Sequence, residues 1–138
     1  MYDHKIVFAS QYFSDGQAVP DDTNADCQNG LRVGGAEGRL AVTFKMATAT
    51  TLAINTTVTI TLLESSDDAV SDAYAAIDPA VTVVKTYAAE KVFEAGEEIV
   101  TVLVPRGVDK WILPHIAVND AAITTADLFD CYLEYLAN

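Results

Sequence analysis

Long hydrophobic runs are missing from this sequence. No apolar stretch approaches the ~18 residues that a membrane-spanning helix requires, so we predict no such helix. The first residues, MYDHKIVFASQYFSD, carry a short apolar patch without a basic region before it or a clear cleavage site, so we expect no signal peptide. These features predict a protein that folds in the cytoplasm of the cell that makes it.

Basic residues are scarce: eight lysines and arginines stand against 20 aspartates and glutamates, giving a formal net charge of −12. Phosphate neutralisation requires Lys and Arg, as does binding to an anionic membrane surface. We therefore expect neither nucleic acid nor a membrane among the partners. The charge favours solubility through self-repulsion, and attraction to a basic partner is the alternative that stays open.

Cysteine is rare as well, with only Cys27 and Cys131. Neither lies in a CxxC motif or near a histidine, which argues against zinc. Without a secretion signal we expect two buried small hydrophobes, with Cys131 in the core, and leave a disulfide between them as the alternative.

Helical periodicity is absent too, and strand periodicity takes its place. Between Leu40 and Ser65, apolar residues alternate with polar or small ones in two runs, as in strands with one buried face. The predicted core positions are Leu40, Val42, Phe44, Met46, Val58, Ile60 and Leu62. Thr57, Thr59 and Thr61 lie opposite. A ten-residue connection disfavours a tight hairpin, so the two strands are expected in opposite sheets.

Further short apolar runs predict strands at 5–10, 81–86, 91–93, 99–104, 110–118 and 128–136. The polar segment VPDDTNADCQNG is expected to be a loop, and Ser14–Gly16 a turn. Pro114 lacks a backbone donor, which predicts an edge strand or a bulge there. Roughly eight strands indicate an all-β fold: one jelly-roll-like β-sandwich domain over residues 1–138, with residues 1–13 as an arm-like segment.

Candidate metal ligands do not form a convincing site. Asp22, Asn24 and Asp26 have the spacing of a calcium loop, but Cys27 and Val33 occupy the positions of its required Gly and Glu. A second acidic group, at Asp67, Asp68 and Asp72, is interpreted as a wet turn, with Ser65 and Ser66 capping it. We predict no bound metal and no cofactor.

Catalytic constellations are equally weak. The sequence has no GxSxG elbow, and we interpret His115 as a half-buried polar residue rather than a base. The chain is therefore expected not to be an enzyme, with no catalytic residues. Trp111, Tyr132 and Tyr135 form a candidate aromatic platform for sugars, but we favour Trp111 and Tyr135 as core residues.

Taken as a whole, the chain resembles the small jelly-roll cement, or decoration, proteins of short-tailed bacteriophage capsids. The residues that carry the resemblance are FASQYFSDGQAV, NGLRVGG, the strand pair 40–63, VTVLVPRGVDKWILPHIAV and FDCYLEYL. It implies a non-enzymatic virion protein on the capsid exterior. Such a protein forms a homo-oligomer, dimer or trimer, and stabilises the capsid by bridging major capsid protein subunits. A sugar- or receptor-binding jelly-roll module is the alternative function.

Two groups of residues are the candidates for contacts with other chains. Phe8, Tyr12 and Phe13 lie in the aromatic N-terminal segment, which either docks on another chain or packs on its own core. Thr57, Thr59 and Thr61 form a row without the charges that keep exposed strands apart. The sequence therefore predicts a subunit or capsid contact on this row.

Overall fold

The computed structural model describes residues 11–33, 40–78, 80–120, 122–124 and 126–135, and this part of the chain consists of strands and their connections. It contains no helix long and apolar enough to cross a membrane. The predicted strand at residues 5–10 and the contact candidate Phe8 lie outside the described residues.

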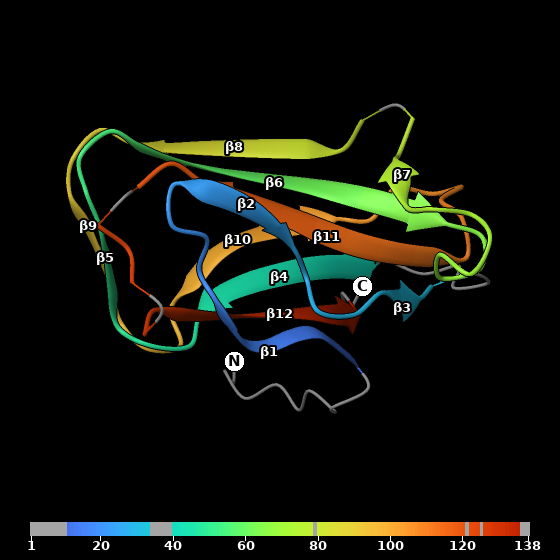
Figure 1. Ribbon diagram of the computed structural model, residues 1–138, viewed down its shortest axis with the longest axis horizontal. Helices are drawn as coiled ribbons and strands as arrows, with labels where there is room; N and C mark the ends of the chain where they lie inside the picture. The colour runs from blue at the N-terminus through green and yellow to red at the C-terminus, as the bar shows by residue number, and fades with distance from the viewer. Residues whose placement is uncertain (1–10, 34–39, 79, 121, 125, 136–138) are drawn as a thin grey trace.

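Two sheets form a β-sandwich (Figure 1). Sheet A has the spatial order β1 (Tyr12–Ala18), β12 (Leu128–Tyr135), β4 (Leu40–Met46) and β10 (Glu98–Leu103). The main strands of sheet B follow the order β2 (Thr23–Asp26), β11 (Trp111–Val118), β6 (Thr56–Ser65) and β8 (Thr82–Tyr87). All these pairings are antiparallel. Eight main strands in these two antiparallel spatial orders form the topology of a jelly roll.

Four short strands complete the fold. β3 (Leu31–Arg32) pairs with β11, and β7 (Ala75–Ala76) pairs with β6. β5 (Thr50–Leu52) and β9 (Lys91–Phe93) form a separate two-stranded sheet at the end of the sandwich away from β3 and β7 (Figure 1).

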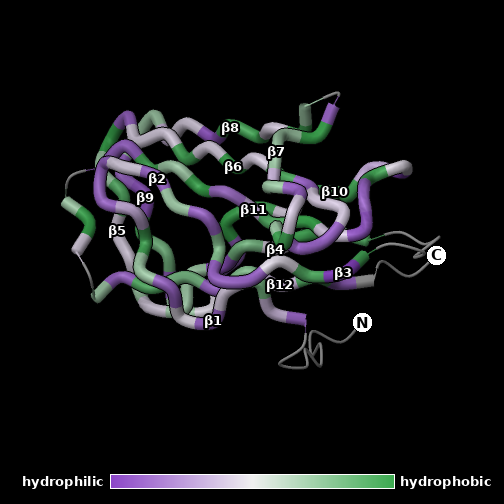
Figure 2. The backbone as a smooth tube through the Cα atoms, turned by 45° about the vertical axis from the view of Figure 1, so that its right-hand side comes forward, coloured by the Kyte–Doolittle hydropathy of each residue, from purple (hydrophilic) through white to green (hydrophobic). Residues whose placement is uncertain are grey.

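The core lies between the two sheets and is built by the predicted alternation. The large apolar side chains that β4 and β6 bury between the sheets are Leu40, Val42, Phe44, Met46, Val58, Ile60 and Leu62. Along β6, hydrophobic residues alternate with threonines from Thr57 to Leu62 (Figure 2). The strands belong to opposite sheets, so the predicted core positions and the prediction against a tight hairpin are confirmed.

The N-terminal contact prediction needs correction at Phe13. Phe13 is 0% exposed and belongs to the core of its own chain, so its side chain is not available to another subunit. Tyr12 is half-buried in β1, where its ring meets Tyr132 edge-on with centroids 5.9 Å apart. Both residues are part of sheet A, because β1 begins at Tyr12.

Ser14–Gly16 is not a turn between strands, as predicted, but an irregularity inside β1. The register with β12 shifts between Ser14 and Gln17, and Gly16 has a φ of 69°. This left-handed conformation suits glycine, and the Gly16 N–H donates to Asp130 Oδ1 at 2.7 Å. The residues Ser14–Gly16, whose types predicted a turn, therefore form a β-bulge.

The predicted loop after residue 19 is also partly wrong, because Thr23–Asp26 forms β2. This strand pairs with β11 from Thr23 opposite Val118 to Asp26 opposite His115. Thr23, Asn24 and Asp26 are all exposed, so β2 has no apolar face to bury and its sequence carries no alternation signal.

Pro114 lies in a central strand rather than at an edge or on a bulge. β11 pairs with β6 through Pro114 opposite Leu62 without a register shift. On its other side, β11 pairs with β2 as far as His115 and with β3 from Ile112, so Pro114 faces the gap between these two strands. Its carbonyl accepts the Cys27 N–H at 2.9 Å, and its missing donor breaks no ladder bond.

Phe44→Ala tests the core. Phe44 is 0% exposed and stacks on Phe129 with ring centroids 5.8 Å apart, so we expect the free energy of unfolding in urea to fall by about 3–5 kcal/mol. Val84→Ala on β8, where Val84 is 58% exposed, is the control and should cost under about 1 kcal/mol. Equal losses in the two variants would contradict this core assignment.

Candidate functional site

The outward face of sheet B is rich in threonine. Because Thr57, Thr59 and Thr61 of β6 pair with Thr86, Val84 and Thr82 of β8, all six side chains lie on the same side of the sheet. Ala117 of β11 is opposite Thr59 and extends the face by one strand. We call these seven residues the threonine face.

The three threonines predicted from the sequence thus lie together, each half-buried. The threonines on β8 were missed, although Thr82, Val84 and Thr86 alternate in the printed sequence. Their period was obscured because β8 is exposed on most positions and Lys85 occupies one of its inward-facing ones. The hydroxyls of Thr57 and Thr86 are hydrogen bonded at 3.2 Å across the two strands.

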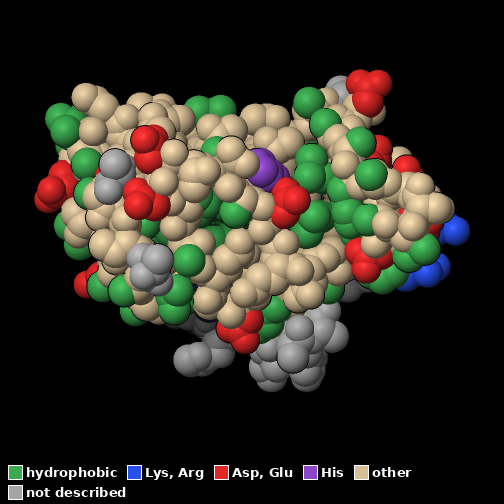
Figure 3. All heavy atoms as spheres, in the orientation of Figure 1, with side chains coloured by type: hydrophobic (Ala, Val, Ile, Leu, Met, Phe, Trp, Pro, Cys, Tyr) green, Lys and Arg blue, Asp and Glu red, His purple; other side chains and the backbone are tan. Residues whose placement is uncertain are grey.

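Charge is nearly absent from this face. In the part of sheet B formed by β8, β11, β2 and β6 up to Thr61, the ionisable groups on the outward side are His115 and Asp26. They form a pair, with Nδ1 of His115 2.7 Å from Oδ1 of Asp26. Figure 3 shows the imidazole beside a carboxylate on a surface with few other charged side chains near it. As predicted, His115 is half-buried.

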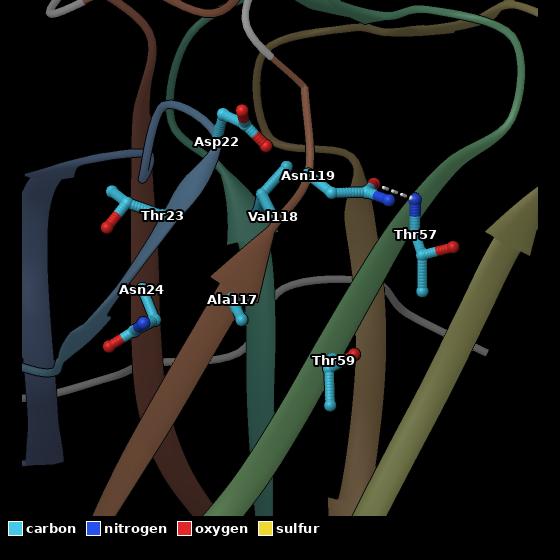
Figure 4. A pocket seen from close by; sticks show the side chains of 8 residues that line it. All are labelled: Asp22, Thr23, Asn24, Thr57, Thr59, Ala117, Val118 and Asn119. Atoms are coloured by element: carbon cyan, nitrogen blue, oxygen red, sulfur yellow. Dashed lines mark hydrogen bonds between the residues drawn. The ribbon is translucent and has the colours of Figure 1, made fainter.

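A shallow groove of about 230 Å³ lies at one end of the threonine face (Figure 4). The groove is deepest at Ala117, because this small side chain lies between the larger Asn24 of β2 and Thr59 of β6, its register partners on the two neighbouring strands. The lining residues are Asp22, Thr23, Asn24, Thr57, Thr59, Ala117, Val118 and Asn119. The groove thus presents hydroxyls, amides and one carboxylate.

Asn119 connects two sides of the groove through hydrogen bonds to Thr57. Its Oδ1 accepts the Thr57 N–H at 2.5 Å, and its own N–H donates to the Thr57 carbonyl at 3.3 Å. Figure 4 shows the first of these bonds joining the chain after β11 to the start of β6. Asp22, which directly precedes β2, has a φ of 50°, in the left-handed region that aspartate tolerates better than most residues.

Asp120, directly after Asn119, anchors this region and is 5% exposed. Its carboxylate accepts the Ala53 N–H at 2.8 Å, the Ala122 N–H at 2.9 Å and the Thr56 hydroxyl at 3.2 Å. Burial raises the pKa of Asp120, but these three hydrogen bonds together lower the pKa below its ordinary value. The charged carboxylate therefore ties the β5–β6 turn to the chain after β11.

The calcium-like spacing of Asp22, Asn24 and Asp26 does not produce a ligand sphere. Asn24 and Asp26 lie on the extended strand β2, and alternate side chains of a strand are about 7 Å apart. Asp26 is bound to His115. Within the described ranges, no three His, Cys, Asp or Glu side chains are grouped as metal ligands.

The second acidic group is a hydrogen-bonded turn. The Asp67 carboxylate accepts the N–H groups of Ser71 and Asp72 at 2.9 and 3.0 Å, while Ser65 Oγ accepts those of Asp67 and Ala69. The hydrogen bond from the Ser71 hydroxyl is the main cause that lowers the pKa of Asp67. These carboxylates organise their own loop.

Trp111 and Tyr132 do not form the aromatic platform considered from the sequence. Trp111 is half-buried on the outward side of sheet B, since it alternates with the buried Ile112, so its assignment to the core is wrong. Tyr132 is buried in sheet A. The two rings therefore belong to different sheets.

No family model matches this chain, and no curated protein matches it.

Asp120→Ala tests the anchor of the groove. Two backbone N–H groups and one hydroxyl lose their acceptor, so we expect the free energy of unfolding at pH 7 to fall by about 1–3 kcal/mol. A lowered carboxyl pKa stabilises the fold above the unfolded value of about 3.9, and this contribution is lost as the pH falls through the folded-state pKa.

The difference in the free energy of unfolding between wild type and Asp120→Ala should therefore shrink from about pH 5 to about pH 2.5 in urea titrations, because this window covers the unfolded-state pKa and extends below it. Asp21→Ala, which removes an exposed carboxylate, is the control. A difference that is the same at both pH values would contradict the anchoring role of the ionised carboxylate.

Proposed function

We propose that this protein is a non-enzymatic structural protein of a phage virion, which stabilises the capsid by bridging major capsid protein subunits. In this role it acts on the capsid exterior as a homo-oligomer. The jelly-roll topology agrees with what the sequence resemblance implies. The observation that carries the proposal is the threonine face, which is uncharged in a chain of net charge −12.

Electrostatics explains why this face suits a contact. Copies of a strongly acidic chain repel one another, and the repulsion is least where carboxylates are absent. The centres of protein interfaces are also depleted in charged residues. Threonine hydroxyls can exchange hydrogen bonds with water for hydrogen bonds with a partner, at little cost in desolvation compared with a charge.

The outer face of sheet A offers less free surface. Thr43, Tyr132 and Glu134 lie on its outward side, opposite in alternation to the core residues, and are nevertheless buried. Thr43 Oγ1 donates to Glu134 Oε1 at 2.9 Å. Of the two outer faces, that of sheet B is therefore the better candidate for contact with a capsid subunit.

Thr59→Lys tests the contact. Thr59 is at the centre of the threonine face, so a lysine there would bury an unpaired charge in any interface. We expect binding to undecorated capsids of the phage that encodes the chain to weaken at least about tenfold, or about 1.4 kcal/mol, in co-sedimentation. Light scattering after size exclusion would measure the oligomer in parallel.

Thr51→Lys is the matched control, because Thr51 is exposed on β5, outside both main sheets. It introduces the same charge and should bind and assemble as the wild type does. Capsid binding and oligomer size both unchanged in a folded Thr59→Lys variant would reject the threonine face as a contact. Failure of the wild type to bind such capsids at any salt concentration would reject the capsid role itself.

A sugar- or receptor-binding module is the second candidate, and the groove favours it. Its hydroxyl, amide and carboxylate groups can form hydrogen bonds with the hydroxyls of a sugar. Its lining lacks an aromatic ring, which makes it a weaker basis than the threonine face.

Ala117→Leu tests this second candidate, since the larger side chain fills the low floor between Asn24 and Thr59. If sugars bind here, calorimetric titration with neutral oligosaccharides should give saturable binding to the wild type and a loss of at least about tenfold, about 1.4 kcal/mol, in the variant. Binding that is absent in the wild type, or the same in both proteins, would reject the groove as a sugar site.

A further inference from the structure

The two cysteines of the chain meet in the core. Cys27 follows β2 and is 5% exposed, whereas Cys131 lies in β12 and is 0% exposed. Both belong to the same hydrophobic cluster, and the Cys27 thiol is among the groups that raise the pKa of the Cys131 thiol, as a neighbouring side chain does. As free thiols they match our expectation of buried small hydrophobes, but their proximity was not predicted.

Backbone contacts hold this arrangement independently of the thiols. The Cys27 N–H donates to the Pro114 carbonyl at 2.9 Å, and the next residue, Gln28, donates its N–H to Ser14 Oγ at 3.0 Å. Ser14 is in turn the register partner of Cys131 across β1 and β12. The segment that carries Cys27 is thus fixed on both sides, facing the strand pair that carries Cys131.

We propose that Cys27 and Cys131 form an intramolecular disulfide when the protein meets an oxidant, and that this bond fastens the β2–β3 side of sheet B to β12 of sheet A. The inference rests on the core geometry alone and does not depend on the proposed function. The segment that carries Cys27 already lies against the strand pair that carries Cys131, and a disulfide requires the two sulfurs to approach to about 2.05 Å.

The oxidant is a low-molecular-weight disulfide, for which oxidised glutathione is the probe. One cysteine thiolate attacks the glutathione disulfide, whose S–S bond breaks, and one reduced glutathione leaves as a mixed disulfide forms. The second cysteine then attacks the protein sulfur of the mixed disulfide and releases the second glutathione. Cys27 and Cys131 together lose two electrons and two protons, and the oxidant gains both.

Burial controls when this happens. Desolvation raises the pKa of the Cys131 thiol well above its ordinary value, and the Cys27 thiol adds to the increase, so the reactive thiolate is rare in the folded chain. The native core thus protects the pair from oxidation, and the bond forms as the segment around Cys27 opens or as the chain folds. The oxidised protein should then return to the same fold, because the thiol positions already meet.

Refolding of the full chain in two redox buffers tests the proposal. The denatured protein is refolded with oxidised and reduced glutathione, or with excess dithiothreitol, and its thiols are counted with Ellman's reagent in denaturant. We expect two thiols in the reduced sample and none in the oxidised one, with an intact mass that shows loss of two hydrogens and no glutathione.

Thermal unfolding measures the consequence. The bond would close a loop of about 100 residues in the unfolded chain, so the oxidised protein should melt about 10 °C above the reduced one, with the same far-ultraviolet circular dichroism. Cys27→Ala is the control and should show no difference between the two buffers beyond the glutathionylation of its single thiol.

Retention of both thiols, glutathione on either cysteine of the wild type, or cross-linked chains in place of an internal bond would each overturn the proposal. So would an oxidised monomer that melts at or below the temperature of the reduced protein. The comparison uses wild-type protein in both states, so it stands even if the Cys27→Ala variant does not fold.

Discussion

The antiparallel register between β6 and β11 determines both the core and the outer face of sheet B. It runs without a shift from Val58 opposite Val118 to Ser65 opposite Trp111. After a slip of one residue the two strands could not both face their apolar side chains into the core: with Ile116 kept inward, β6 would turn Ile60 outward and bring Thr59 into the core. The apolar side chains fix the register because only one of the two alternatives buries them, and the position of the threonines follows from that choice.

Two different devices close the long sides of the sandwich. Where β8 and β10 are the edge strands, Lys85 faces inward from β8 and its Nζ donates to the Ile99 carbonyl at 3.0 Å. An inward-pointing charge at an edge discourages further strands from pairing there. On the other side, where β1 meets the chain after β2, the Ser14 and Gln28 contact joins the sheets above the two buried thiols.

These devices leave the flat outer side of sheet B as the part of the described structure that combines exposure with little charge. Its edge strand β8 directs Lys85 inward, the His115–Asp26 pair joins β11 to β2, and the side chains of the threonine face between them are threonine, valine and alanine. A face of this kind can approach another protein without either repulsion or the burial of an unpaired charge. The groove at Ala117 is a shallow depression in the same surface. Asp120 stabilises the β5–β6 turn next to this groove.

The sequence by itself determined the class of fold, the two strands that build the core and the row from Thr57 to Thr61. Period-two alternation is a local property, so it can be seen in the order of residues. Alternation could not predict β2, because the residues of this strand are exposed on both faces. The predictions for Pro114 and Trp111 were wrong because the surroundings of these residues depend on which strands become neighbours. Only the tertiary structure decided that β8 extends the threonine row, that Asp120 receives three donors and that Cys27 meets Cys131. Each of these contacts joins distant parts of the chain, and strand order, which the jelly-roll topology sets, is not written in local periodicity.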